Sequence, residues 1–317
     1  AGTYVESLII NKTVSIIGAG NTATIITPAA NSKGMLITAN NVLIKDLKIV
    51  TSGTTIDTNF AIEVQGTNNV RINNNVLQTA AANGSHGIYV STSASTGLNI
   101  TNNVITVGGY ATGIYTTQLS TAHSGWKISG NTITAIGGNP IELYDVSSSE
   151  VSYNNLTTAL STTGNSNVIW SSQMSNLSNL VFNYNIVNGS GGSQVAILAD
   201  FLILGDGLTN TKVTTVTITG NTFSNWDSRA LRIGSNVTSV IVNNNKFLRS
   251  NQTQTLKNED PSSVNAENNW WGTANKNTIS TLVSSNVDYT PWWYSSTGAG
   301  SDIILPVVTF KNTPYSN

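Results

Sequence analysis

The stretch LNITNNVI at residues 98–105 contains the unit that decides the fold, because the chain repeats it. Clear copies are VRINNNVL at 70–77, WKISGNTI at 126–133, VTITGNTF at 216–223 and VIVNNNKF at 240–247. In each copy two apolar residues alternate, and an asparagine follows three residues after the second. These asparagines are Asn75, Asn103, Asn131, Asn154, Asn185, Asn221, Asn245 and Asn269, at steps of 28, 28, 23, 31, 36, 24 and 24 residues. A period in the twenties with variable insertions is typical of a solenoid.

A second set of short apolar strands repeats in the same register. It reads MLI from residue 35, IEV from 62, IYV from 88, IYT from 114, IEL from 141, IWS from 169, ILA from 197 and LRI from 231. Alternation turns successive side chains to opposite faces of a strand. Asparagine tolerates the bend that follows, and stacked amides can bond from coil to coil. We therefore predict an all-β, single-stranded parallel β-helix of about 9–10 coils with an asparagine ladder.

The composition narrows the class of protein. The 317 residues are 39% hydrophobic and only 9% charged, with a net charge of −1, whereas ordinary soluble domains are about 25% charged. A near-neutral balance predicts no nucleic-acid partner, and no apolar run approaches the roughly 20 residues of a membrane span. The chain has no cysteine, which excludes disulfides and thiolate metal sites. No carboxylates have the spacing of a calcium loop, so we predict neither a metal nor a cofactor.

The sequences at both ends of the chain resemble those of a known protein family. The opening AGTYVESLIINKTVSIIGAG and the closing NAENNWWGT and VDYTPWW resemble right-handed parallel β-helix repeat proteins of the pectate-lyase-like superfamily, in their secreted and surface-layer-associated members. The resemblance covers about residues 1–295 and implies a right-handed helix and an extracellular, secreted or cell-surface location. It implies no single function, because this fold hosts lyases, hydrolases, epimerases and non-catalytic adhesins or sheath proteins.

The predicted domain organisation is a β-helix over residues 1–295 followed by a linker and strand-like tail at 296–317. Within the helix, residues 264–295 are expected to cap the C-terminal end, with Trp270 and Trp271 closing the core. The tail begins with STGAGS, a flexible linker composition. Because the opening residues read as the middle of a coil, we expect a leader or upstream segment before Ala1.

The candidate ligand-binding residues lie on the outward face of the second strand set. Adjacent coils stack about 4.8 Å apart, so one patch should span about 15 Å. Aromatic rings stack on sugar rings while acids and amides bond hydroxyls, so the predicted partner is a polysaccharide or cell-surface glycan. In the alternative interpretation, the aromatic side chains only cover their neighbours' backbone. The candidates are Tyr89, Tyr115, Glu142, Tyr144, Trp170 and Asp200.

If the protein is an enzyme, Glu142 and Asp200 are the predicted catalytic pair. They lie two coils apart, on the order of 10 Å, at the upper limit for an inverting carboxylate pair. On an open sheet, solvent should keep both ionised. Catalytic members of the superfamily that the chain resembles carry other sequence motifs. These are WIDH or RxPxxR in pectate lyases, paired aspartates with GHG in polygalacturonases, and DPH in alginate epimerases. None is present. His86 and His123 are expected to be solvated corner residues.

The missing signatures favour a non-catalytic extracellular cell-surface module, structural or adhesive, which binds polysaccharide through the aromatic face. The first alternative is a polysaccharide lyase, hydrolase or epimerase that acts on the same face. The second is a self-assembling filament, sheath or surface-layer subunit, since open β-helix ends invite edge pairing and thus self-association.

Overall fold

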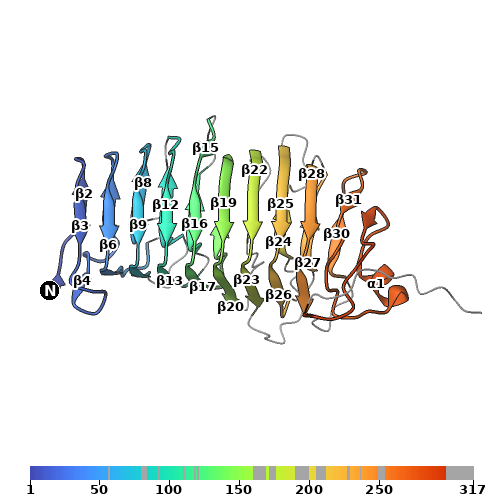
Figure 1. The fold of residues 1–317 in the computed structure, drawn as a ribbon. Coiled ribbons are helices and arrows are strands. Elements are labelled where there is room, and N and C mark those ends of the chain that lie inside the picture. Colours follow the sequence, from blue (N-terminus) through green and yellow to red (C-terminus); the bar gives the residue numbers. More distant parts are fainter. Residues whose placement is uncertain are drawn as a thin grey trace, which may run out of the picture.

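The computed structural model confirms the predicted right-handed parallel β-helix, whose coils stack in one column from β1 to the helix α1 (Figure 1). It describes residues 1–297 except 56–57, 80–83, 92, 110, 118, 120, 160–168, 171–175, 190–199, 205–211, 227–228, 236 and 249–253. Each coil contributes strands to three parallel sheets, called A, B and C here. The chain runs through each coil in the order B, C, A.

The strands are short, and each pairs in parallel with its equivalents in the coils before and after. Sheet A holds β1 (Gly2–Tyr4), β4 (Thr24–Ile26), β7 (Lys48–Val50), β10 (Val76–Gln78), β13 (Val104–Val107), β17 (Thr132–Ile136), β20 (Asn155–Ala159), β23 (Ile186–Gly189), β26 (Thr222–Ser224) and β29 (Lys246–Leu248). Sheet B holds β2 (Leu8–Ile10), β5 (Met35–Ile37), β8 (Ile62–Gln65), β11 (Ile88–Ser91), β14 (Ile114–Thr116), β18 (Ile141–Glu142), β21 (Ile169–Trp170), β24 (Asp200–Leu204), β27 (Arg229–Ile233) and β30 (Leu256–Asn258).

Sheet C contains the longest strands. It holds β3 (Ser15–Ile17), β6 (Leu43–Lys45), β9 (Arg71–Asn73), β12 (Asn99–Thr101), β16 (Lys127–Ser129), β19 (Val146–Ser152), β22 (Asn176–Asn183), β25 (Lys212–Thr219), β28 (Val237–Asn243), β31 (Val264–Asn265) and β32 (Val287–Asp288), and β15 (His123–Ser124) pairs with β19. Like residues stack on like along the core: Ile72, Ile100 and Ile128 are register partners and at most 1% exposed. The apolar alternation in the sequence is therefore the inward face of this core.

The asparagine ladder is present as predicted. All eight asparagines are at most 1% exposed. Asn103 is typical: its backbone N–H donates to Oδ1 of Asn131 at 2.9 Å, and its Nδ2 donates to the carbonyl of Ile72 at 2.8 Å. The residue before each ladder asparagine has a left-handed backbone, which turns the chain from sheet C into sheet A; these residues are Asn74, Asn102, Gly130, Tyr153, Tyr184, Gly220, Asn244 and Asn268.

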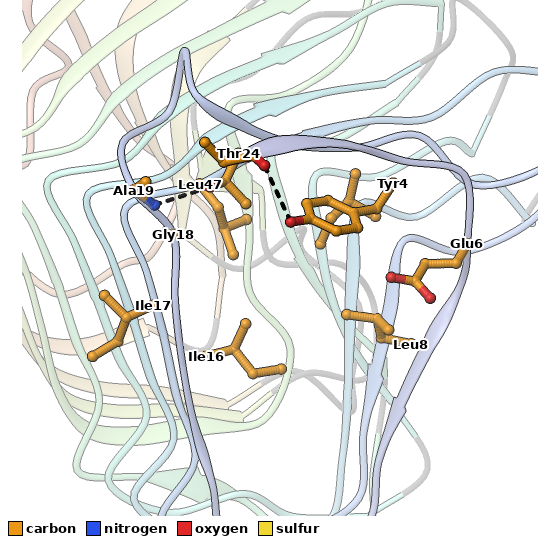
Figure 2. Close-up of a pocket in the computed structure, with 11 residues that line it drawn as sticks. Tyr4, Glu6, Leu8, Ile16, Ile17, Gly18, Ala19, Thr24 and Leu47 are labelled. Atoms are coloured by element: carbon orange, nitrogen blue, oxygen red, sulfur yellow. Dashed lines mark hydrogen bonds between the residues drawn. The ribbon is translucent and has the colours of Figure 1, made fainter.

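The two ends of the core differ. At the C-terminal end, the helix α1 (Lys276–Leu282) buries Ile279 and Leu282, and Trp271 and Trp292 are also buried. Residues 298–317, most of the predicted linker and tail, lie outside the described residues. At the first coil, a cavity of about 400 Å³ remains; Figure 2 shows the apolar side chains that line it, Leu8, Ile16 and Leu47 among them.

The described residues include no helix that is long and apolar enough to cross a membrane.

Candidate functional site

The candidate site lies on the outward face of sheet B, over β5 to β21. The strand register places one outward residue per coil in a single row, as the sequence predicts. Register partners follow one another in the order Leu36, Glu63, Tyr89, Tyr115, Glu142 and Trp170. We call this row and the side chains that contact it the sheet-B face. The side chain of Trp170 lies outside the described residues.

Asp200 does not take its predicted position relative to Glu142. Leu202 pairs with both Ile169 and Leu231 and thus holds the register position predicted for Ile197. The predicted ILA stretch at 197–199 lies outside the described residues. Asp200 is the first residue of β24, two coils away from Glu142 and three residues off its row. Strand spacing then separates the two Cα atoms by about 14 Å, whereas the prediction assumed a separation on the order of 10 Å. The sequence pattern misled because several apolar triplets occur between residues 195 and 204.

Aromatic rings form a continuous cluster over β8 to β18. The rings of Tyr89 and Tyr115 stack with centroids 5.6 Å apart and planes at 15°. His86 stacks on Tyr115 with a centroid distance of 4.3 Å and planes at 5°. Phe60 packs on Tyr89 at 4.3 Å, and Tyr144 meets Tyr115 edge-on at 5.7 Å. Since Tyr89 and Tyr115 remain only half-buried, the cluster both covers the sheet and presents ring surface to a ligand.

Glu142 is the central acid of the face and is 6% exposed. The hydroxyl of Tyr144 donates to its Oε1, while Asn139 Nδ2 and Thr112 Oγ1 each donate to Oε2 at 3.1 Å. Burial raises the pKa of this carboxyl, and the three hydrogen bonds only partly offset the effect. Among the described residues, no Lys or Arg forms an ion pair with Glu142. The expectation that Glu142 lies on an open, solvated surface is therefore wrong.

Glu63, three coils away, has the opposite electrostatics. Its carboxylate forms an ion pair with Lys33 and accepts hydrogen bonds from Ser91 Oγ at 2.6 Å and Gln65 Nε2 at 2.7 Å. Burial alone would raise the pKa of Glu63, but these partners together hold it below its usual value. A pocket of about 460 Å³, lined in part by Lys33 and Leu36, continues the face toward the first coil. The sheet-B face therefore contains two different acids. The pKa of Glu142 is raised, whereas the pKa of Glu63 is lowered and its charge is balanced by Lys33.

Both histidines are buried, contrary to the prediction that they are solvated. His86 is 8% exposed and its Nδ1 accepts a hydrogen bond from the backbone N–H of Thr112 at 3.0 Å. His123 is 0% exposed and its Nδ1 accepts from the N–H of Ser95 at 3.0 Å. Burial lowers the pKa of each imidazole to about 4. Both rings are therefore neutral at pH 7, and the sequence pattern missed them because coil corners are usually exposed.

Asp145 is the acidic residue that follows Glu142 in the same coil. It is 2% exposed, and its Oδ2 accepts a hydrogen bond from the N–H of Leu119 at 2.8 Å. Its charge also acts on His123, whose pKa it raises against the larger effect of burial. Asp145 lies three residues after Glu142, at the bend between β18 and β19, with a φ of 51°, so the two Cα atoms are at most about 10 Å apart. Asp145 is therefore closer to Glu142 than Asp200 is.

Several contact residues of the site carried no signal in the sequence. Asn139 and Thr112 stand at turns before β18 and β14, and Phe60 stands before β8. Each reaches the face because the chain turns from sheet A into sheet B at that point. In the part of the chain that the structure describes, no group of three or more His, Cys, Asp or Glu side chains could hold a metal ion.

No family model matches the chain, and no curated protein sequence matches it. Solved structures match its fold. DFA-IIIase from Arthrobacter chlorophenolicus A6 without its lid has a TM-score of 0.56 at 12% identity, over 91% of this chain and 86% of that chain. The C387A mutant of the same protein in complex with DFA-III has a TM-score of 0.53 at 10% identity, over the same shares. The catalytic unit of GH87 alpha-1,3-glucanase from Streptomyces thermodiastaticus strain HF3-3 has a TM-score of 0.46 at 14% identity, over 93% and 63%.

The fold is that of a right-handed parallel β-helix, which these solved structures share. The prediction of a non-catalytic structural or adhesive module is wrong. DFA-IIIase, which shares this fold at TM-scores above 0.5, is an enzyme. The physical premise of the prediction also fails, because Glu142 is buried and its pKa is raised.

Proposed function

We propose that the protein is a glycoside hydrolase that acts on an uncharged polysaccharide or oligosaccharide over the sheet-B face. The observation that carries the proposal is the environment of Glu142. Its carboxyl is buried, its pKa is raised, and its partners Tyr144, Asn139 and Thr112 are all neutral. A carboxyl whose pKa is raised by burial is better suited to act as a general acid toward a glycosidic oxygen.

The hydrogen bonds around Glu142 are compatible with both states of the acid. When the carboxyl is protonated, one oxygen must donate, and the hydroxyls of Tyr144 and Thr112 can turn and accept. When the proton passes to the leaving-group oxygen, the same hydroxyls and Asn139 donate to the carboxylate. Glu142 can therefore lose its proton to the scissile bond and regain it from water without moving its neighbours.

Hydrolysis also needs a carboxylate that activates water, and we assign this role to Asp145. It lies three residues after Glu142 at the bend that follows β18, so the two Cα atoms are at most about 10 Å apart, a separation compatible with an inverting pair that has a water between the two groups. Asp145 would take a proton from the water as the water attacks the anomeric carbon. The bond to the leaving oxygen breaks as Glu142 protonates it, so the product has the inverted anomeric configuration.

The charges of the face support an uncharged substrate. Lys33 is neutralised by Glu63, and Glu142 sits among neutral donors. The flat rings of Tyr89 and Tyr115 suit the apolar faces of sugar rings. A polymer of uronic acids would need cations that this row does not offer. The resemblance to DFA-IIIase, crystallised in complex with DFA-III, supports a carbohydrate substrate. We also propose an extracellular location, where such polymers are found.

The test is hydrolysis of a panel of starch, fructan, β-glucan, xylan and polygalacturonate, measured as released reducing ends. We expect turnover on one uncharged polymer and a loss of about 100-fold or more in Glu142→Gln and in Asp145→Asn. Glu150→Gln, on the outward row of sheet C, is the matched control and should retain full activity. Absence of turnover on every polymer, or full activity in Glu142→Gln, would contradict the proposal.

A further inference from the structure

Two tyrosines occupy backbone positions that suit other residues. Tyr153 and Tyr184 each precede a ladder asparagine, at the corner between sheets C and A, with φ of 56° and 53°. The other six positions of this column are asparagine or glycine, the residues that adopt left-handed backbone most easily. A bulky side chain there strains the backbone, and such strain is often found at functional sites. The fold alone therefore does not account for tyrosine at either position.

The two rings form an exposed stack. Tyr153 is 62% exposed and Tyr184 is 51% exposed, with ring centroids 5.1 Å apart and planes at 15°. The ring of Tyr184 lies over Gly220, where an added Cβ would come within 2.5 Å of its Cδ1. On the other side, the column position before Tyr153 is Gly130, which has no side chain of its own, and the small amide of Asn102 lies over it. Tyr153 therefore keeps most of its surface accessible, with Tyr184 stacked behind its ring.

The nearest outward neighbours of this stack carry no charge. Strand register identifies the outward neighbours over four coils, from sheet C on one side and sheet A on the other. All but Ile186 bear hydroxyl or amide groups, and Ile186 is 52% exposed. They are Ser129, Ser152, Asn183 and Thr219 on sheet C and Thr132, Asn155, Ile186 and Thr222 on sheet A.

This chemistry selects among possible occupants. Nucleic acid would need lysines or arginines against its phosphates, and none stands among these neighbours. A stable protein interface buries roughly 800 Å² on each side, far more apolar area than two rings and one isoleucine provide. Aromatic faces ringed by uncharged hydrogen-bonding groups suit an uncharged sugar ring, whose C–H face stacks while its hydroxyls bond the rim.

We propose that Tyr153 and Tyr184 form a second carbohydrate-binding site, at which a sugar unit of an uncharged polymer stacks on Tyr153. The corner between sheets C and A is separate from the sheet-B face, so this site would hold the polymer away from the bond that is cleaved. The choice of an uncharged polymer rests on the proposed function, whereas the site itself rests on the tyrosine stack.

The test uses substitutions that the backbone favours. Tyr153→Asn with Tyr184→Asn places at both positions a residue that this column already uses, so the melting temperature should stay equal or rise. Binding is measured by affinity electrophoresis in native gels that contain starch, fructan, β-glucan, xylan or polygalacturonate, with Glu142→Gln as the background to prevent hydrolysis. We expect retardation by one uncharged polymer and an apparent Kd about tenfold higher in the double variant. Asn244→Gly, in the same column, is the control and should bind normally.

Unchanged retardation in the double variant would overturn the second site, and so would an equal loss in Asn244→Gly or a melting temperature that falls with the affinity. The absence of retardation by every uncharged polymer would overturn it too. Hydrolysis by the wild-type protein distinguishes failure of the proposed hydrolase function from failure of the second site. Retardation that depends on the two tyrosines, without hydrolysis by the wild-type protein, supports the second site and contradicts the hydrolase. Hydrolysis with unchanged retardation contradicts the second site alone.

Discussion

Thr112 connects His86 to Glu142: its backbone N–H donates to Nδ1 of His86 at 3.0 Å, and its hydroxyl donates to Oε2 of Glu142 at 3.1 Å. His86 in turn lies flat on Tyr115, whose register partner is Glu142. The aromatic cluster and the candidate acid are therefore one hydrogen-bonded and stacked unit. A change at Thr112 should alter the acid without removing the ring cluster.

The first prediction concerns the pH dependence of activity. Thr112→Val removes the hydroxyl but keeps the backbone N–H that bonds His86. Because this hydroxyl lowers the pKa of Glu142 against the effect of burial, its loss should raise the pKa further. A general acid works while protonated, so the alkaline limb of the rate profile should move to higher pH. An unshifted limb in an active variant would show that another group controls it.

The second prediction concerns stability at high pH. The folded pKa of Glu142 is raised above its unfolded value, so the stability this group contributes is full below the unfolded pKa and is lost as the pH rises through the folded pKa. Glu142→Gln removes the ionisation. The variant should gain stability relative to wild type as the pH rises, measured by urea unfolding from pH 4 to pH 9. A constant difference between the two proteins across this range would be the contrary result.

The third prediction concerns acid stability. Burial lowers the pKa of His86 and His123 from 6.5 to about 4. The unfolded chain therefore binds protons below pH 6.5 while the folded chain does not, and stability falls between pH 6.5 and about 4, by about 3 kcal/mol for each histidine. In His123→Asn, the amide oxygen can accept from the N–H of Ser95 without titrating.

Urea unfolding of His123→Asn at pH 7 and pH 4 checks this prediction. The fall in the free energy of unfolding between the two pH values should be about 3 kcal/mol smaller than in wild type. His86 remains in the variant and should account for part of the residual fall. An identical fall in both proteins would mean that His123 is not neutral in the fold.

The fourth prediction concerns substrate charge. Glu63→Gln leaves Lys33 without its partner at the N-terminal end of the sheet-B face. A free ammonium group attracts carboxylates, so binding of polygalacturonate should strengthen while that of uncharged polymers changes little, and added salt should reverse the gain. Glu259→Gln, which removes an ion-pair partner of Arg232 and Lys257 at β27 and β30, is the matched control for the loss of an acidic partner elsewhere. Equal gains in both variants would argue against a role of Lys33 in selecting the substrate.

The fifth prediction concerns the ladder. Asn131→Ala removes a buried amide whose Nδ2 donates to Ile100 O and to Oδ1 of Asn154, each at 2.9 Å. The loss leaves buried backbone groups without partners and should cost about 1–3 kcal/mol of unfolding free energy. Asn99→Ala, on the outward side of β12, should cost much less. Chemical denaturation of both variants provides the comparison, and equal losses would remove the special role of the ladder.

The sequence by itself determined the fold, because the coil repeats a local rule. Alternating apolar residues such as Val70 and Ile72 face inward, and the asparagine that follows bonds its equivalent in the next coil and a backbone carbonyl of the coil before. Because every coil repeats this pattern, an irregular coil does not change the prediction for the other coils. The same alternation also predicted the outward row from Leu36 to Trp170, which has one residue per coil.

Only the tertiary structure decided the chemistry. The pattern cannot show that Thr112 and Asn139, from different coils, close over Glu142, and this burial raises the pKa of an acid expected to be ionised. It also cannot fix the register where insertions lengthen a coil, as for Asp200. Alternation determines the inward face of a strand, whereas the environment of an outward side chain depends on contacts between coils that the local sequence does not encode.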